Sequence, residues 1–231
     1  MQAASLNEVN QGMSGSSGRW LSRQKRDPFV REARADGYRS RAAFKLIELD
    51  QRFRLFKPRA VVLDLGAAPG SWSQVAQQRV GPTGVVIACD LLEIPSLCGN
   101  GQLPDVNIMT GDVRDLEVQE RIVAACGARA LDLVISDMAP NLSGVRARDQ
   151  AEAIGLADTT LEICAALLRK DGQLVVKLFQ GEGSQAWITE ARQRFATVRI
   201  VKPKASRDES REVYVVASGH VGMCVQEISV A

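Results

Sequence analysis

Residues 60–72, with the sequence AVVLDLGAAPGSW, constrain the fold of this chain more than any other stretch. The run from Val61 to Leu65 is apolar, β-branched and bounded by turn residues, which predicts a buried strand. Gly66 and Gly70 then predict a tight loop, and the sequence from Trp72 to Val80 has helical character. A strand, a glycine-bearing turn and a helix N-terminus together form a site suited to a nucleotide-like ligand.

The spacing of the two glycines narrows the class of ligand. The loop reads Gly-x-x-x-Gly, whereas the loop that cradles a dinucleotide pyrophosphate reads Gly-x-Gly-x-x-Gly. Asp64, near the end of the strand, adds negative charge where a phosphate would be repelled. The pattern therefore favours a cationic or zwitterionic adenosine ligand, with S-adenosylmethionine as the leading candidate, over a nicotinamide dinucleotide. Glycines that only form a tight turn are the alternative for this stretch taken alone.

Acidic residues follow further predicted strands. Asp90 ends a second buried strand and lies twenty residues after Gly70, the separation at which a nucleotide fold places a carboxylate on the ribose hydroxyls. Asp112 follows a short third strand at 106–109, where it can accept a hydrogen bond from an adenine amino group. Asp137 ends a fourth strand that begins at Leu131. Because ligands of open α/β sheets bind outside the carboxyl ends of the strands, these acids indicate one cleft.

The remaining pattern predicts an α/β, Rossmann-like, doubly wound fold. Helices are expected at 115–126, 149–169 and 184–195, with Gly172 as the left-handed cap after the second, and strands at 173–179, 197–202 and 213–218. We expect a seven-stranded, mostly parallel sheet with helices on both faces and one antiparallel strand from the closing hairpin. Lys177 lies in an otherwise apolar strand, where a lysine is rare without a partner or a task.

Basic residues are concentrated near the start of the chain. Residues 19–59 hold 13 Lys or Arg and 5 Asp or Glu, although the whole chain has a net charge of only +2. The segment also contains four aromatic rings that could stack on unpaired bases: Trp20, Phe29, Tyr38 and Phe44. This bias is typical of a nucleic-acid-binding arm, and an ordinary solvated charged helix is the alternative.

A helix is expected within this basic segment, from Tyr38 to Phe53. Its apolar residues recur at helical spacing, so the helix can dock on the domain that follows. Lys45 lies beside that apolar stripe. Taken alone, it reads as a snorkelling surface lysine, and the alternative is that it points along the docking seam toward the cleft.

Several classes of protein do not fit the composition. The cysteines are odd in number, scattered and without a C-x-x-C pair, so neither a disulfide framework nor a thiolate zinc site is expected. Their free thiols predict a cytoplasmic location. The only histidine is His220, which argues against His-ligated metals and Ser-His or Cys-His catalysis. No apolar run is long enough to span a membrane. Residues 1–18 are polar and rich in Ser and Gly, which predicts a disordered tail.

Six stretches together resemble the bacterial RlmE (RrmJ/FtsJ) family of ribosomal RNA large-subunit methyltransferases. They are DLGAAPGSWSQ, IACDLL, GDVRD, SDMAPNLSG, VVKLFQGEG and SRDESREVYVVA, and the resemblance runs from about Arg19 to Gly219. Ser71 is a mild departure, since many members have a second glycine there. The resemblance implies a monomeric enzyme that transfers a methyl group from S-adenosylmethionine to a ribose 2′-hydroxyl. Its typical target is a uridine in the A loop of 23S rRNA, in the large ribosomal subunit.

The resemblance also implies roles for individual residues and domain limits. The catalytic tetrad would be Lys45, Asp137, Lys177 and Glu212, and the cofactor-binding positions Gly70, Trp72, Asp90, Asp112 and Asp137, with no metal. The expected parts are a tail (1–18), a basic RNA-binding segment with its docking helix (19–59), a methyltransferase domain (60–219) and a second tail (220–231).

Lys177 is interpreted as the base that takes the proton of the ribose hydroxyl. Desolvation, Lys45 and a sulfonium favour its neutral form, whereas Asp137 and Glu212 favour the charged form. In the alternative, Lys177 stays charged and orients the hydroxyl lone pair. Two other functions remain as alternatives: the same methyl transfer on tRNA or another RNA, and a non-catalytic RNA-binding module.

Overall fold

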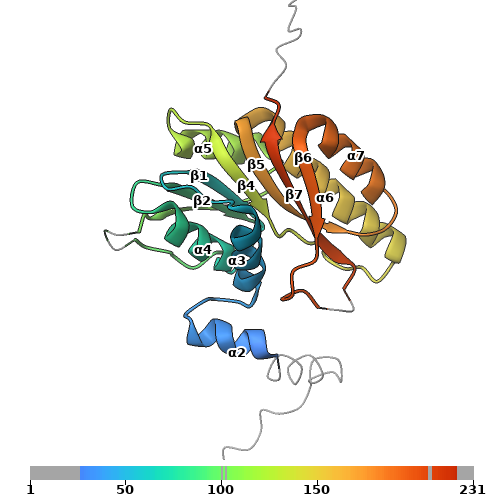
Figure 1. The fold of residues 1–231 in the computed structure, drawn as a ribbon, viewed down its shortest axis with the longest axis horizontal. Coiled ribbons are helices and arrows are strands. Elements are labelled where there is room, and N and C mark those ends of the chain that lie inside the picture. Colours follow the sequence, from blue (N-terminus) through green and yellow to red (C-terminus); the bar gives the residue numbers. More distant parts are fainter. Residues whose placement is uncertain (1–26, 100, 102, 208–209, 223–231) are drawn as a thin grey trace, which may run out of the picture.

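The computed structural model describes residues 27–99, 101, 103–207 and 210–222. Its centre is a seven-stranded sheet with the order β3-β2-β1-β4-β5-β7-β6 (Figure 1). The strands are β1 (Val61–Leu65), β2 (Val85–Asp90), β3 (Val106–Thr110), β4 (Leu131–Ser136), β5 (Leu168–Phe179), β6 (Phe195–Val201) and β7 (Glu212–His220). β7 runs antiparallel to both its neighbours, and the other neighbouring pairs are parallel. The predicted doubly wound sheet with one antiparallel strand is confirmed.

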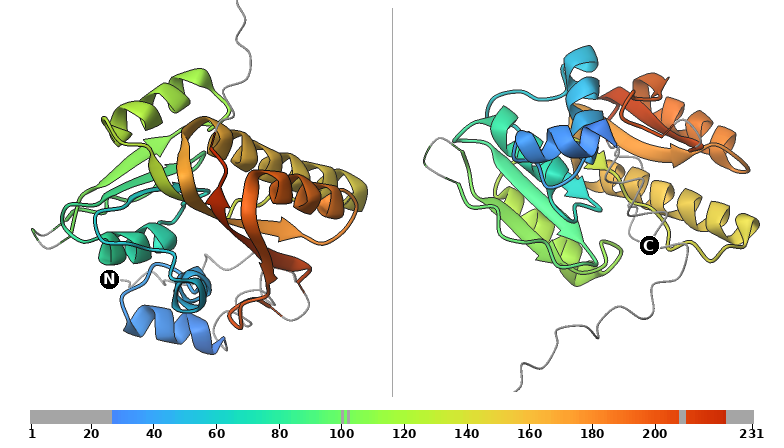
Figure 2. Two further views of the ribbon diagram at one scale, coloured as in Figure 1. Left: turned by 45° about the horizontal axis from the view of Figure 1, so that its top comes forward. Right: turned by 90° about the horizontal axis from the view of Figure 1, so that it is seen from below.

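Helices cover both faces of the sheet (Figure 2). One apolar cluster joins α3 (Ala42–Phe53) and α4 (Ser71–Val80) to one face. A second cluster joins α5 (Leu116–Cys126), α6 (Arg146–Leu167) and α7 (Ser184–Arg194) to the other. A short helix, α2 (Pro28–Ala35), lies against α3 on the side away from the sheet (Figure 1). The tight burial on both faces is what fixes the carboxyl ends of the strands relative to one another.

The predicted docking helix is confirmed as α3, although it begins at Ala42 instead of Tyr38. Gly37, at a φ of 77°, interrupts the backbone ahead of it, and the separate helix α2 precedes that break. Leu46 and Leu49 have no exposed surface, so α3 belongs to the core of the domain. The aromatic rings of this region pack on one another: the Phe44 ring lies 5.9 Å from that of Phe29 and 6.0 Å from that of Tyr38.

The prediction that Gly172 caps α6 is wrong. The helix ends at Leu167, because Leu168 is already extended and pairs with Leu131 of β4. Gly172 lies inside β5, and it is Asp171 that takes a left-handed conformation, with a φ of 62°. The register between β4 and β5 shifts between Leu131 and Leu133, so the turn-prone Asp-Gly pair forms an irregularity in the strand instead of a helix end.

Some predictions lie outside the described residues: the tail over residues 1–18, Trp20 and Cys224. The predicted limits of the basic segment and of the methyltransferase domain stay predictions. Among the residues that the structure does describe, none of the helices is long and apolar enough to cross a bilayer.

Candidate active site

The pairing of β5 with β7 gathers four side chains on one face of the sheet. Lys177 is opposite Tyr214, and Phe179 is opposite Glu212. Residues directly opposite in a pair, and residues two apart along a strand, project from the same face. This is the face that α3 covers, and the side chain of Lys45 extends from α3 to Glu212 on this face.

The predicted tetrad is brought together by this arrangement. Lys177 Nζ lies 2.6 Å from the Asp137 carbonyl oxygen and 3.0 Å from its Oδ1. Lys45 Nζ lies 2.8 Å from Glu212 Oε1 and donates a hydrogen bond to the Tyr214 hydroxyl at 2.9 Å. That hydroxyl in turn donates to Asp137 Oδ1 at 2.6 Å. Two lysines and two carboxylates thus form one connected network with Tyr214 at its centre.

Sequence reasoning missed Tyr214. The only available signal was its spacing of two residues from Glu212 along a predicted strand, because residues two apart in a strand project from the same face. Tyr214 has no exposed surface, and a buried tyrosine hydroxyl needs a hydrogen-bond partner. Burial raises its pKa well above the usual value, and the charges of Asp137 and Glu212 act in the same direction. The hydroxyl therefore keeps its proton and donates a hydrogen bond to Asp137.

Asp137 is the anion on which the network converges. Burial alone would raise its pKa, but the charges of Lys177 and Lys45 and the Tyr214 hydrogen bond outweigh burial and hold it below the usual value. Its carboxylate therefore stays ionised at neutral pH. The side chain of Lys177 is only 7% exposed, so it is not a surface lysine. A lysine is rarely buried without a partner of opposite charge, and here that partner is the Asp137 carboxylate.

A cavity of about 330 Å³ opens at the carboxyl ends of β1, β2, β3 and β4. Three of the predicted cofactor-binding acids line it: Asp90, Asp112 and Asp137. The two Asp90 oxygens accept hydrogen bonds from the Ala68 and Leu92 backbone N–H groups, which orient the carboxylate. The Asp112 carboxylate is bound by Arg114, and this hydrogen bond lowers its pKa.

The other two predicted cofactor-binding residues, Gly70 and Trp72, do not line this cavity. Gly70 is the N-cap of α4, at a φ of 105°. Trp72 is 2% exposed, donates from Nε1 to the Ala42 carbonyl at 2.7 Å and packs its ring 5.7 Å from that of Tyr214. In this structure Trp72 therefore holds α3 against the network.

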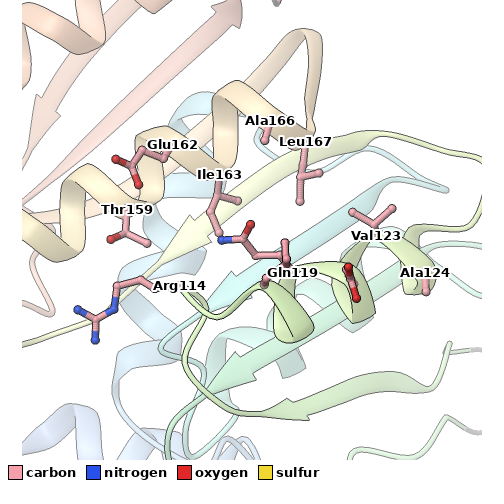
Figure 3. Close-up of a pocket in the computed structure, with 11 residues that line it drawn as sticks. Arg114, Gln119, Val123, Ala124, Thr159, Glu162, Ile163, Ala166 and Leu167 are labelled. Atoms are coloured by element: carbon pink, nitrogen blue, oxygen red, sulfur yellow. The ribbon is translucent and has the colours of Figure 1, made fainter.

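A larger cavity, of about 650 Å³, lies between α5 and α6 (Figure 3). Thr159, Glu162 and Ile163 of α6 face the α5 side chains across it, and Arg114 stands at one end. It shares Arg114 and Thr159 with the cavity at the strand ends. Its lining contains no member of the tetrad, because α5 and α6 cover the opposite face of the sheet.

Asp64 is buried beneath the glycine loop. Its Oδ2 accepts a hydrogen bond from the Ser73 hydroxyl at 2.6 Å, and its Oδ1 has no partner among the described residues. Burial raises its pKa to about 7, and the charges of Asp137 and Asp90 act in the same direction, while the Ser73 hydrogen bond opposes them. The negative charge expected from the sequence is thus only partial at neutral pH.

We predict that Asp64→Asn makes the protein more stable, and more so at alkaline pH. The folded carboxyl titrates at about 7 and the unfolded one at its usual value of 3.8, so the folded state binds more protons between these values. Stability is therefore lost as the pH rises through this window, by roughly 4 kcal/mol in total. Denaturant unfolding should show the full gain of the variant at pH 8 and less than half of it at pH 5. The exposed Asp36→Asn variant is the control, and an equal gain for Asp64→Asn at both pH values would contradict this account.

Gly66 allows the loop to pass close to the segment after β4. It has a φ of 70°, and a Cβ there would lie 2.7 Å from Met138 Cγ and 2.8 Å from Met138 Cα. We predict that Gly66→Ala lowers the free energy of unfolding by at least about 1 kcal/mol more than Gly127→Ala does. Gly127 has a similar φ of 65° with nothing within 4 Å of a Cβ, so it isolates backbone strain from the close approach. Equal losses in denaturant unfolding would rule out the steric explanation.

Comparison with known proteins gives the family. Residues 38–220 match the model of the FtsJ-like methyltransferase family, a span that includes α3 and all seven strands. The chain belongs to the FtsJ-like methyltransferase family. It is 46% identical over 211 residues to the ribosomal RNA large subunit methyltransferase E of Hahella chejuensis, which covers 91% of this chain and all of the relative. The resemblance read from the six sequence stretches is confirmed.

Two solved structures are similar to this chain in fold. A putative ribosomal RNA methyltransferase from Plasmodium falciparum aligns with a TM-score of 0.70 at 26% identity, over 80% of this chain and all of that one. Aeropyrum pernix fibrillarin, solved with natively bound S-adenosyl-L-methionine, aligns with a TM-score of 0.53 at 14% identity, over 78% of this chain and 75% of that one. The second likeness concerns the fold alone.

Proposed function

We propose that this methyltransferase transfers a methyl group from S-adenosylmethionine to a ribose 2′-hydroxyl of large-subunit rRNA, at a uridine in the A loop of 23S rRNA. The observation that carries the proposal is the Lys177–Asp137 pair, held at the edge of the cavity at the strand ends. The name of the Hahella relative supports rRNA of the large subunit as substrate. We further propose that the enzyme acts as a monomer in the cytoplasm.

The cavity at the strand ends suits an adenosine ligand. Asp90 keeps free lone pairs on both oxygens beyond the two backbone hydrogen bonds, so it can also accept from ribose hydroxyls. Leu91 and Leu92 add apolar surface to the lining beside it, and Asp112 lies where an adenine amino group could donate. Gly70 and Trp72, which do not line the cavity, would contribute to cofactor binding indirectly, by fixing the conformation of the glycine loop. When bound there, S-adenosylmethionine supplies an electrophilic methyl group on a positively charged sulfur.

The tetrad would supply the acceptor side of the reaction. The ribose oxygen would accept the methyl group that S-adenosylmethionine supplies, and its hydroxyl proton would pass to Lys177 Nζ and from there to water. Asp137 holds Lys177 in place through both its carbonyl and its carboxylate. Lys45, paired with Glu212, steadies Asp137 through the Tyr214 hydroxyl. In the alternative role, Lys177 keeps its proton and orients the hydroxyl by a hydrogen bond.

The test of the proposed function is tritiated methyl transfer to large ribosomal subunits from a strain that lacks the enzyme. The expected result is label on one ribose 2′-oxygen, mapped to the A loop. Label on tRNA but not on subunits would keep the chemistry and replace the substrate. Tight cofactor binding with no transfer to any RNA would overturn the enzymatic function and favour a binding module.

Exposed arginines of α2 would form part of the RNA-binding surface. Arg31 and Arg34 lie on this helix next to α3, and both are exposed. We predict that Arg31→Glu together with Arg34→Glu raises the KM for subunits by roughly ten-fold at moderate salt and leaves kcat nearly unchanged, because phosphate contacts act on affinity. The exposed pair Arg121→Glu and Arg129→Glu changes the net charge equally and is the control. An equal rise in both double variants would mean that only net charge matters.

A further inference from the structure

A separate cavity of about 330 Å³ lies beside the tetrad. Two of its lining residues adjoin tetrad members. The Phe179 ring centroid lies 5.8 Å from Lys177 Nζ, and Arg211 directly precedes Glu212. Pro140, Leu142 and Phe179 give the cavity apolar walls, while Gln150 and Arg211 add polar groups. A volume near 330 Å³ is at the lower end of the range of roughly 300 to 1,000 Å³ for small-ligand sites.

The segment after Asp137 forms a wall between this cavity and the one at the strand ends. Met138, Ala139 and Asn141 line the cavity at the strand ends, whereas Pro140 and Leu142 line the separate one. Ligands in the two cavities would therefore both lie next to the start of this segment, where Asp137 holds Lys177. A nucleotide whose 2′-oxygen is within reach of Lys177 must place its base nearby, since the base is bonded to the neighbouring ribose carbon.

Among the described residues that line this cavity, Gln150 alone has a buried side-chain polar atom without a hydrogen-bond partner. It is 7% exposed, and its Nε2 donates to the Phe179 carbonyl at 3.1 Å and to the Glu182 carbonyl at 3.0 Å. These two bonds to acceptors fix which end of the amide is the nitrogen. The Oε1 atom has no hydrogen-bond partner among the described residues and almost no exposed surface, so the side chain must shift slightly toward the cavity for a ligand to reach it. Since a buried acceptor without a donor is unfavourable, the site is suited to a ligand that brings an N–H group.

We propose that this cavity receives the base of the target nucleotide and that Gln150 and Arg211 select a uracil. This inference rests on the proposed function. The uracil N3–H donates to Gln150 Oε1, and Arg211, which is exposed at the rim, donates to a carbonyl oxygen next to N3. Phe179 and the apolar walls contact the faces of the ring, as aromatic side chains do with unpaired bases.

The chemistry of the two pyrimidines gives the selectivity. Cytosine has a lone pair on N3 where uracil has a proton, so it would place one acceptor against another at Gln150 Oε1. A site built to accept a hydrogen bond rejects a ligand that lacks the donor, because its buried polar group stays unpaired. We expect the wild-type enzyme to favour uridine over cytidine at the target by roughly 10- to 100-fold in kcat/KM.

The test uses large subunits that carry either uridine or cytidine at the mapped target position. Rates of methyl transfer on both are compared for the wild type, Gln150→Leu and Arg211→Ala, with S-adenosylmethionine affinity and unfolding measured for each. Gln119→Leu is the matched control, since Gln119 lines the cavity between α5 and α6. We expect Gln150→Leu to reduce the uridine preference to less than three-fold, Arg211→Ala to weaken it, and Gln119→Leu to leave it unchanged.

The ratio separates selection from folding. A variant that is merely less stable loses rate on both bases alike and keeps the wild-type ratio, and such a result for Gln150→Leu and Arg211→Ala would overturn the proposal. A wild type that methylates both bases equally would also overturn it, with the proposed function intact. No methylation of either subunit by the wild type would instead refute the proposed function, and this inference with it.

Discussion

Lys177→Met should reduce methyl transfer by roughly 10²- to 10⁴-fold while S-adenosylmethionine binding persists. This range is what a positioned acid or base contributes, and Lys177 is 7% exposed with its Nζ fixed at Asp137. Methionine has similar bulk and adapts to apolar surroundings, so the packing of β5 should be kept. Single-turnover transfer with saturating cofactor measures the chemical step.

Two further variants define the role of Lys177. Lys170→Met, in the same strand but exposed, is the control and should retain full activity. Lys177→Arg keeps a positive charge but does not release a proton near neutral pH, so it should fail if Lys177 is the base. Substantial transfer by Lys177→Arg would favour the alternative, in which a charged Lys177 orients the hydroxyl. Transfer by Lys177→Met at more than a tenth of the wild-type rate would exclude both roles.

Asp137→Ala should cause the largest loss of stability among the tetrad variants. Its carboxylate is the counter-charge of Lys177 and accepts from Tyr214, whose hydroxyl links it to Lys45. Removing one partner of a buried charge pair leaves the other uncompensated and costs about 3 to 5 kcal/mol. Denaturant unfolding measures the loss, and methyl transfer should disappear with it.

The matched control for Asp137→Ala is Asp132→Ala, in β4, the strand that Asp137 directly follows. Asp132 pairs with Arg169 at 2.6 Å and accepts a hydrogen bond from the Val61 N–H at 2.8 Å. Both charged side chains are partly exposed, so the loss should be about 1 to 2 kcal/mol, below that of Asp137→Ala. Asp137→Asn keeps the shape of the side chain and removes only the charge. If Asp137→Asn were as stable as the wild type, the network would be held by packing and hydrogen bonds instead of by charge.

Much of the fold followed from short-range patterns. Val61–Leu65, Val85–Asp90 and the acids after the strands were evident because apolar runs and turn residues mark parallel strands strongly. The end of α6 was not, because pairing of Leu168 with Leu131 outweighs the local turn preference of Asp171 and Gly172. That pairing is a tertiary contact, which local propensity does not contain.

Apart from the acids at the strand ends, the residues alone indicated the site only where a side chain conflicts with its surroundings. A lysine in an apolar strand marks Lys177, but a tyrosine in a strand is ordinary, so Tyr214 gave no such signal. The sequence did not indicate Gln150 either, because only the folded structure brings its Nε2 to the carbonyls of Phe179 and Glu182. Its unpaired Oε1 is a property of the folded chain.

The position of β7 has a consequence for synthesis on the ribosome. Of the seven strands that the structure describes, β7 is the last to be made, yet it lies between β5 and β6, and β6 has no strand neighbour other than β7. Until β7 is made, β6 lacks the strand with which it pairs, and Lys177 and Phe179 lack their partners Tyr214 and Glu212. A nascent chain released only as far as α7 therefore carries the cavity at the strand ends but no complete tetrad. The complete tetrad should therefore form in one late step of folding, when β7 inserts between β5 and β6.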